Sequence, residues 1–505
     1  MAGDHTGPPA TEEIPLVPNE RPTRRARGLI GALVTAVLCA VAGAGLAHGS
    51  PAPGARVMQA SPAVDALWAL APDGSSISVC QDPTASASIT TCFDSASQIT
   101  LPVQTKKTLN SYPMTTDGTN VYFGLQPGYS CPIGGYGTNC TQVQVGWRGV
   151  LPVVLAAGDG YLFFSAVGGS VLYRCPANLP YTQATSMPSG CVVLDNAGSN
   201  EIASLAYANG TVYAGLSESG LLWSCDANQV NACTILDVLA ENGGDVPVQS
   251  LAVGGGYVWA GLAPGGGGSG SSPIWRCPPG LPNYCSLWDT AGYSVVSLAD
   301  DGAGTLWAAV VNTGDQQWTH PGEVIWSCPE AYANGCTNVI SNVFPYQVTA
   351  GGGHGFSAVS NGPKYPPIAY GATQYPRSVV WASKDNTSVP GIVYTPAGGT
   401  AGLGGVRVQV KAPTGALARV CARRGTLSAT IRVRGPHTPR VARAVTLCSG
   451  GYPVREASKR FDLLYPGAYS VTVRSAAFSG SARVVITRER TVRRVVRLRA
   501  AMPSR

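Results

Sequence analysis

The chain has 505 residues, 45% of them hydrophobic, and a formal net charge of +7. A chain of this size and apolar content can bury large cores, and its length predicts more than one domain. Its 63 Gly and 39 Pro residues favour many tight turns and argue against an architecture of long helices.

The first predicted element is an apolar helix at residues 29–47. A polar, Pro-rich stretch and a basic cluster (Arg21, Arg24, Arg25 and Arg27) precede it. This order is typical of a signal peptide or signal anchor whose basic side stays in the cytoplasm. The long leading stretch favours an uncleaved single-pass anchor, with residues 1–28 as a disordered cytoplasmic tail and 48–55 as a linker. A cleaved, secreted product is the alternative.

Twelve of the 15 cysteines form six short pairs that recur every 44 to 52 residues. The pairs are Cys80/Cys92, Cys131/Cys140, Cys175/Cys191, Cys225/Cys233, Cys277/Cys285 and Cys328/Cys336, and Cys421/Cys448 is a seventh candidate. Such local pairing predicts disulfides and an oxidising compartment. Zinc is the rival interpretation, but the gaps of 8 to 16 residues contain neither CxxC nor interleaved His.

Each cysteine pair lies in the same local pattern, clearest at residues 202–216, 248–262 and 295–310. The pattern predicts four short strands per unit, separated by Gly, Asn, Asp, Pro and Ser clusters. A four-stranded unit repeated about every 50 residues indicates a β-propeller, because one such sheet cannot bury both faces alone. The cysteines then bridge the two outermost strands, where an edge is most prone to fray.

One aromatic residue in the second strand of each unit predicts seven blades within residues 56–397. These residues are Trp68, Tyr122, Phe164, Tyr213, Trp259, Trp307 and Phe356. Strand aromatics such as Trp223, Trp259 and Trp307 are expected to pack between blades and not to form a carbohydrate-binding stripe. Unit one takes Val57–Ser61 as its inner strand, and unit seven runs from Tyr346 to about Thr395. A six-bladed alternative uses Tyr346–Ala350 to complete blade one.

Charge marks a boundary near residue 398. Residues 396–505 hold 21 basic and three acidic residues, a net of +18, which leaves 13 basic and 24 acidic residues, a net of −11, for the rest. Alternating apolar positions at Val406–Val410, Ala429–Val433, Tyr469–Val473 and Val492–Leu498 predict a basic β-sandwich at 398–505. The whole chain is therefore expected to be all-β after its N-terminal helix.

Two resemblances accompany these patterns. The propeller repeat, as in VVSLADDGAGTLWAAV (295–310), resembles the two-component-regulator and NHL class, which implies a sensor, a scaffold or occasionally an enzyme. The run Tyr465–Val473 followed by Arg483–Leu498 resembles the carboxypeptidase-regulatory-like domain, a transthyretin-like sandwich, which implies a structural or adhesive accessory.

Two binding sites are predicted. Long loops of units six and seven are expected to gather aromatic and polar residues on the propeller rim, where they would bind a glycan or a protein partner, or simply pack the loops down. They are Gln316, Gln317, Trp318, His320, Tyr365, Tyr370, Tyr375 and Arg377. Arg493, Arg497 and Arg499 share one face of the last strand and are predicted to bind an envelope polyanion. A solvated surface and docking on the acidic propeller are the alternatives.

The predicted function is an exported cell-envelope protein whose propeller is a non-catalytic binding or scaffold module. We expect a cell-wall glycan or envelope protein as partner, membrane attachment through the N-terminal helix, and no nucleic acid, cofactor, metal or catalytic residue. The alternative is an extracellular hydrolase or lyase using loop acids at Asp195, Glu201, Asp237, Glu241 and Asp245. Streptogramin lyases are propellers too, but the chain has no matching His-Glu-His arrangement.

Overall fold

The computed structural model describes the chain from residue 65 to residue 500, with gaps. The described ranges are 65–70, 76–81, 97–100, 113–133, 139–166, 168–217, 220–239, 246–263, 272–291, 294–311, 324–341, 344–351, 354–360, 378–382, 391–395, 404–435, 441–454, 457–464, 467–487 and 491–500. The predicted apolar helix at 29–47, with its flanking tail and linker, lies outside these ranges. Within them, no helix has the length and apolar character needed to cross a bilayer.

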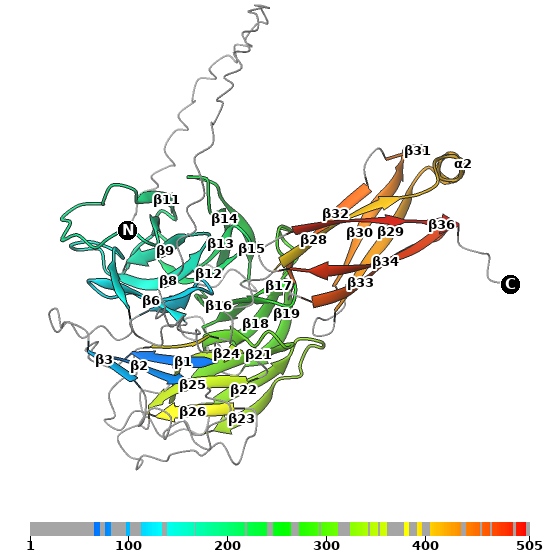
Figure 1. Ribbon diagram of the computed structural model, residues 1–505. Helices are drawn as coiled ribbons and strands as arrows, with labels where there is room; N and C mark the ends of the chain where they lie inside the picture. Colours follow the sequence, from blue (N-terminus) through cyan, green and yellow to red (C-terminus); the bar gives the residue numbers. More distant parts are fainter. Residues whose placement is uncertain are drawn as a thin grey trace, which may run out of the picture. The chain divides into compact units, whose positions relative to one another are not determined.

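Residues 66–395 form successive small sheets of the kind found in propeller blades (Figure 1). Six described sheets have four strands and one has three. In sheet order the strands are β27 (Gly391–Thr395), β1 (Ala66–Leu70), β2 (Ser76–Gln81) and β3 (Ser97–Thr100); β4 (Met114–Thr116), β5 (Asn120–Phe123), β6 (Gly128–Pro132) and β7 (Thr141–Val143); β8 (Pro152–Gly158), β9 (Tyr161–Ala166), β10 (Val171–Pro176) and β11 (Val192–Asn196); β12 (Ile202–Ala208), β13 (Thr211–Leu216), β14 (Leu221–Asp226) and β15 (Cys233–Val238); β16 (Val248–Gly254), β17 (Tyr257–Leu262), β18 (Ser272–Cys277) and β19 (Ser286–Ala291); β20 (Ser294–Asp300), β21 (Thr305–Val311), β22 (Val324–Pro329) and β23 (Thr337–Ser341); and β24 (Phe344–Gly351), β25 (His354–Ser360) and β26 (Ser378–Ala382).

The repeat pattern forms these sheets through tight turns and buried second strands. Between β12 and β13, Asn209 and Gly210 both have positive φ values (51° and 78°), the conformation that a tight hairpin turn requires. The seven second-strand aromatics predicted to be core are all at most 3% exposed. Hydrophobic clusters join neighbouring sheets, as where Phe163 packs with Val212. The predicted core position is confirmed for Trp259 and Trp307, whereas Trp223 is half-buried.

The sheets follow one another in a closed order. The inner strands contact their neighbours in the sequence β27, β4, β8, β12, β16, β20, β24 and again β27. The inner strand of the first sheet is β27, so assigning Val57–Ser61 to that position was wrong. Assigning Tyr346–Ala350 there was wrong as well, because β24 belongs to the last sheet with β25 and β26. Pairing of β27 with β1 covers an edge that would otherwise be open.

The last of these sheets departs from the repeat. Its third strand, β26, pairs in parallel with β25, whereas the pattern predicts an antiparallel strand. The segment expected to be its outer strand is β27, which pairs in the first sheet instead. The three-stranded sheet is also the one whose sequence holds no cysteine.

The predicted disulfides are present wherever both cysteines are described. Sulfur–sulfur bonds join Cys131–Cys140, Cys175–Cys191, Cys225–Cys233, Cys277–Cys285, Cys328–Cys336 and Cys421–Cys448. Cys80 is also disulfide-bonded, and its predicted partner Cys92 lies outside the described residues. In one sheet Cys225 and Cys233 lie directly opposite each other on β14 and β15. This set of bonds is typical of an exported protein.

Residues 404–500, which we call the C-terminal module, form two sheets around one core. One sheet has the order β32 (Ala457–Leu464), β28 (Gly404–Lys411) and β35 (Thr491–Arg497). The other has the order β31 (Tyr452–Pro453), β30 (Val441–Ser449), β29 (Leu427–Arg434), β33 (Gly467–Ser475), β34 (Phe478–Ile486) and β36 (Arg499–Ala500). A single hydrophobic cluster includes Val408 of the first sheet and Val471 of the second.

The module contains a helix that the strand pattern did not predict. Helix α2 (Thr414–Arg424) buries Leu417 and Cys421 and ends at Gly425, which has a φ of 70°. The disulfide from Cys421 to Cys448 ties the helix to β30. The sequence does indicate this helix, because Leu417 and Cys421 lie four positions apart, as on one face of a helix, in a stretch rich in Ala and Arg.

The C-terminal module contacts the propeller sheets through β32. Leu463 is fully buried in a cluster with Tyr213 and Val258, and its carbonyl accepts a hydrogen bond from the Gly256 N–H (2.8 Å). Leu463 has a φ of 59°, a conformation that a residue with a branched side chain rarely adopts without surrounding support. The guanidinium of Arg443 donates to the Pro279 carbonyl (3.2 Å), and its burial lowers its pKa. These two residues link the module to the propeller.

Candidate functional site

All eight residues of the predicted rim site lie outside the described residues. Gln316, Gln317, Trp318 and His320 fall in the gap at 312–323, and Tyr365, Tyr370, Tyr375 and Arg377 fall in the gap at 361–377. The rim site therefore stays a prediction from sequence.

The acidic residues considered for catalysis are engaged in structural hydrogen bonds where they are described. In three successive sheets, a carboxylate in the outermost strand accepts the N–H of the second cysteine of the next sheet. These inter-sheet bonds join Asp195 to Cys233 (2.9 Å), Asp237 to Cys285 (2.8 Å) and Asp289 to Cys336 (3.1 Å). Glu201 accepts the N–H of Gly168 (3.0 Å), and Glu241 and Asp245 lie outside the described ranges.

A second bond accompanies each inter-sheet carboxylate. Two residues before the second cysteine, an Asn with positive φ donates its N–H to the carbonyl that precedes the Asp. The pairs are Asn231 to Leu194 (2.7 Å), Asn283 to Leu236 (2.9 Å) and Asn334 to Trp288 (3.0 Å). Each disulfide-bonded turn thus holds the outer strand of the preceding sheet. Ile340 occupies the register of Asp289 in the next sheet, and the sheet that follows has no cysteine.

The three arginines predicted to bind a polyanion lie together in the C-terminal module. Arg493, Arg497 and Arg499 are exposed and line one groove of about 1020 Å³. Arg493 and Arg497 lie beside Arg407 and Lys411 in the parallel register of β35 with β28. The outward face of β35 is therefore basic, as its alternation predicted.

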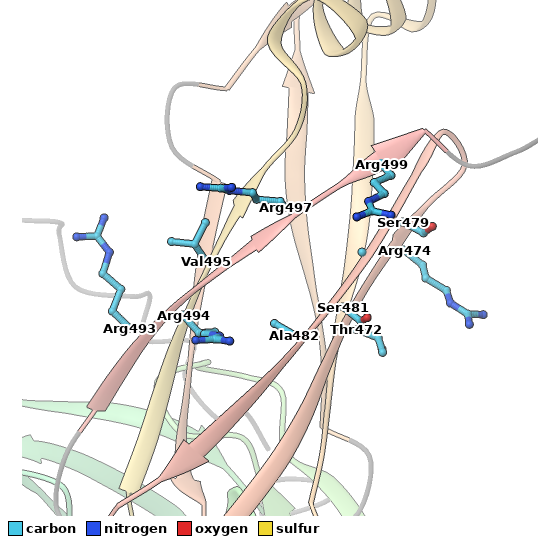
Figure 2. Close-up of a pocket in the computed structure, with 11 residues that line it drawn as sticks. Thr472, Arg474, Ser479, Ser481, Ala482, Arg493, Arg494, Val495, Arg497 and Arg499 are labelled. Atoms are coloured by element: carbon cyan, nitrogen blue, oxygen red, sulfur yellow. The ribbon is translucent and has the colours of Figure 1, made fainter.

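The groove contains two further arginines that the strand pattern did not single out. Arg474 comes from β33, and Arg494 comes from β35. Arg494 pairs in register with the buried Val408, which puts it on the core side of its strand, yet it is exposed. Figure 2 shows its side chain reaching into the space between β35 and β34, towards Ala482.

The groove exists because β34 and β35 belong to different sheets. Strand β35 runs next to β34, and the chain continues from β35 into β36. Of β35 and β36, only β36 pairs with β34, in antiparallel register at Phe478 and Ser479. At that end Gly480 allows a close approach, since a β-carbon there would lie 2.5 Å from the Arg497 carbonyl oxygen. Beyond Gly480, β34 pairs with β33 and β35 pairs with β28. The edges of β34 and β35 that face each other are not paired in the described residues, and the groove lies between these edges.

The electrostatics of the groove are uniformly positive. Its lining consists of five arginines, the hydroxyl residues Thr472, Ser479 and Ser481, and the small or aliphatic residues Gly480, Ala482 and Val495. Arg493 donates to Gln409 Oε1 (3.0 Å). Asp462 is the acidic residue of the module within the described ranges, and it pairs with Arg460 (2.6 Å) rather than with a groove arginine. The guanidinium groups of the groove thus present their charge to solvent.

In the described part of the chain, no three His, Cys, Asp or Glu side chains gather as a metal site would require. The groove itself offers only cations and neutral hydroxyl donors. It can therefore bind anions by charge and by hydrogen bonds from guanidinium groups.

No protein-family model and no curated protein matches the chain. Among solved structures, a chain of a nidogen/laminin complex matches at 11% identity with a TM-score of 0.36, covering 66% of this chain and 98% of that one. A catalytically inactive virginiamycin B lyase from Staphylococcus aureus with quinupristin matches at 10% identity and a TM-score of 0.38, covering 59% and 93%. The PQQ-bound aldose sugar dehydrogenase from Streptomyces coelicolor matches at 15% identity and a TM-score of 0.31, covering 48% and 85%. No residue role transfers at these values.

Proposed function

We propose that the chain is an exported binding protein of the cell envelope, in which the C-terminal module grips an anionic polymer and the propeller is a rigid scaffold. In this proposal the seven sheets of residues 66–395 are the blades of one closed propeller, and the module is a β-sandwich of the carboxypeptidase-regulatory-like type. The helix at 29–47 anchors the chain, and the rim residues around Trp318 and Tyr370 bind a glycan or protein partner.

The observation that supports this proposal is the arginine groove. Five exposed guanidinium groups from three strands line one concave surface, and the described carboxylate of the module pairs elsewhere. Five cations on one surface give it a positive potential, which attracts anions. The disulfides favour an oxidising compartment, where envelope polymers and not nucleic acids are the available polyanions.

The test compares two double variants of the full-length chain that lose the same charge. Arg494→Gln/Arg497→Gln removes two cations from the groove, whereas Arg419→Gln/Arg423→Gln removes two exposed cations from α2. We expect the first variant to lose retention on purified cell walls from which membrane has been removed, and the second to keep it. Equal retention of both variants would overturn the groove as the binding site.

The rim is tested separately, because its residues lie outside the described ranges. Trp318→Ala and Tyr370→Ala are expected to reduce binding to a glycan array without changing retention on the anionic polymer. Unchanged glycan binding by both variants would remove the rim from the proposal.

A further inference from the structure

We infer that the polymer held in the arginine groove carries phosphate groups, spaced along an extended backbone. This inference rests on the proposed function and specifies its ligand. Three features of the lining support it. The lining has no aromatic side chain, its arginines come both from β35 and from β33, and the hydroxyl residues Thr472, Ser479 and Ser481 accompany them.

The composition of the lining argues against several anionic ligands. Its eleven residues include no aromatic side chain, so the groove offers no platform on which a base or a sugar ring could stack. Ala482 and Val495 are its largest apolar side chains, too small a surface to insert into acyl chains. The ligand that suits such a lining is recognised by its charged groups alone.

The arginines come from both walls of the groove, and in Figure 2 Arg494 reaches between β35 and β34 while the side chains of Arg474 and Arg493 extend outward on either side. Arg493, Arg494 and Arg497 lie along β35, while Arg474 lies on β33, across β34, with Arg499 beside Ser479 (Figure 2). A carboxylate is planar, and its two oxygens typically meet one guanidinium fork. The oxygens of a phosphate point in several directions, so one group can accept hydrogen bonds from guanidinium and hydroxyl groups that lie on different sides of it.

The groove also contains hydroxyl groups that can donate hydrogen bonds to phosphate oxygens. Thr472 lies opposite Ser481 and Arg474 lies opposite Ser479 in the register of β33 with β34, which places hydroxyls next to guanidinium groups. Along a strand, residues two apart are separated by about 6.8 Å. Arg497 ends β35 and Arg499 begins β36 two positions further on, so their placement suits a polymer whose anionic groups recur at short intervals.

The test measures binding of the full-length chain to linear polyphosphate, to poly-L-glutamate at the same concentration of charge, and to phosphatidylglycerol vesicles. We expect polyphosphate to bind about tenfold more tightly than poly-L-glutamate. Arg474→Gln is expected to weaken polyphosphate binding about tenfold and poly-L-glutamate binding less than about twofold. Arg419→Gln, on α2, serves as the charge-matched control.

The outcomes separate this inference from the proposed function. Equal binding of polyphosphate and poly-L-glutamate, with both reduced by Arg494→Gln/Arg497→Gln, would overturn the phosphate preference and leave the polyanion groove intact. Vesicle binding as tight as polyphosphate binding would assign the groove to a lipid surface and overturn the inference if Arg494→Gln/Arg497→Gln weakens it, because binding through the helix at 29–47 does not depend on the groove. Binding of all three probes that no groove variant changes would overturn both.

Discussion

Replacing Asp237 by Asn tests whether the inter-sheet carboxylate bonds stabilise the propeller. Both carboxylate oxygens of Asp237 accept backbone N–H groups: Oδ1 accepts from Val238 (2.7 Å) and Oδ2 from Cys285 (2.8 Å). Asparagine has the same shape but only one acceptor oxygen, and its NH₂ group is a donor. One of the two N–H groups must therefore face another donor in the variant.

The expected cost follows from the loss of one hydrogen bond to a charged acceptor. Such a bond contributes about 1.5–3 kcal/mol, and the partial exposure of Asp237 favours the lower end, about 1.5 kcal/mol. The unfolding entropy of about 330 residues is about 0.7 kcal/mol/K, so this loss lowers the Tm by about 2 °C.

Differential scanning calorimetry measures this shift, with Asp226→Asn as the matched control. Asp226 lies in the same sheet and accepts a single local bond from the Asn228 N–H (2.9 Å), which an Asn at this position can also accept. We expect the control to change stability by less than about 0.5 kcal/mol and so to unfold within about 0.7 °C of the wild type. If Asp237→Asn unfolds at the wild-type temperature, or if both variants shift equally, the inter-sheet bond does not stabilise the ring.

Two further predictions concern the disulfides and a buried tyrosine. Cys277→Ser/Cys285→Ser opens a short loop and should lower the free energy of unfolding in denaturant titrations by about 2–3 kcal/mol, and an unchanged value would contradict the stabilising role of the bond. The Tyr122 hydroxyl donates to Asp117 Oδ2 (2.7 Å), and burial, with this carboxylate, raises the pKa of Tyr122 above its ordinary value near 10. Because the folded state favours the protonated phenol, its contribution is complete below pH 10 and is lost as the pH rises towards the folded pKa. Tyr122→Phe should thus cost about 1 kcal/mol at pH 8 and less at pH 11, and an equal cost at both would argue against this linkage.

Local sequence patterns predicted most strands, disulfides and core residues of the propeller. They did not predict the pairing of its last strand with its first sheet. The spacing of Cys225 and Cys233 predicted their bond, and the recurring aromatic in the second strand predicted the core position of Trp259. The pairing of β27 with β1 joins segments more than 300 residues apart, and no local periodicity reports such a contact. The role of Asp237 had a signal, since an apolar residue followed by Asp recurs at 194–195, 236–237 and 288–289. This signal could not separate a structural role from the catalytic role considered for Asp237, because the hydrogen bond joins two different units.

The groove was predictable only in part. Period-two alternation identified Arg493, Arg497 and Arg499 as one face of the last strand. The same alternation assigned Arg494 to the core face, and it could not foresee that β34 and β35 separate there and leave the side chain exposed. Arg474 joins them from β33 because of the order of strands in the second sheet, which single-strand patterns do not encode.

The salt dependence of polyphosphate binding tests the arginine groove most directly. Each guanidinium that neutralises a phosphate releases bound counterions, and five such contacts predict a slope of log K against log salt of about −3.5, using the value for single-stranded polyanions. Arg494→Gln/Arg497→Gln should reduce the slope to about −2.1, while Arg419→Gln/Arg423→Gln should leave it unchanged. A slope that is the same in all three proteins, or that both double variants reduce equally, would contradict a specific groove and leave only non-specific attraction by the net charge of the module.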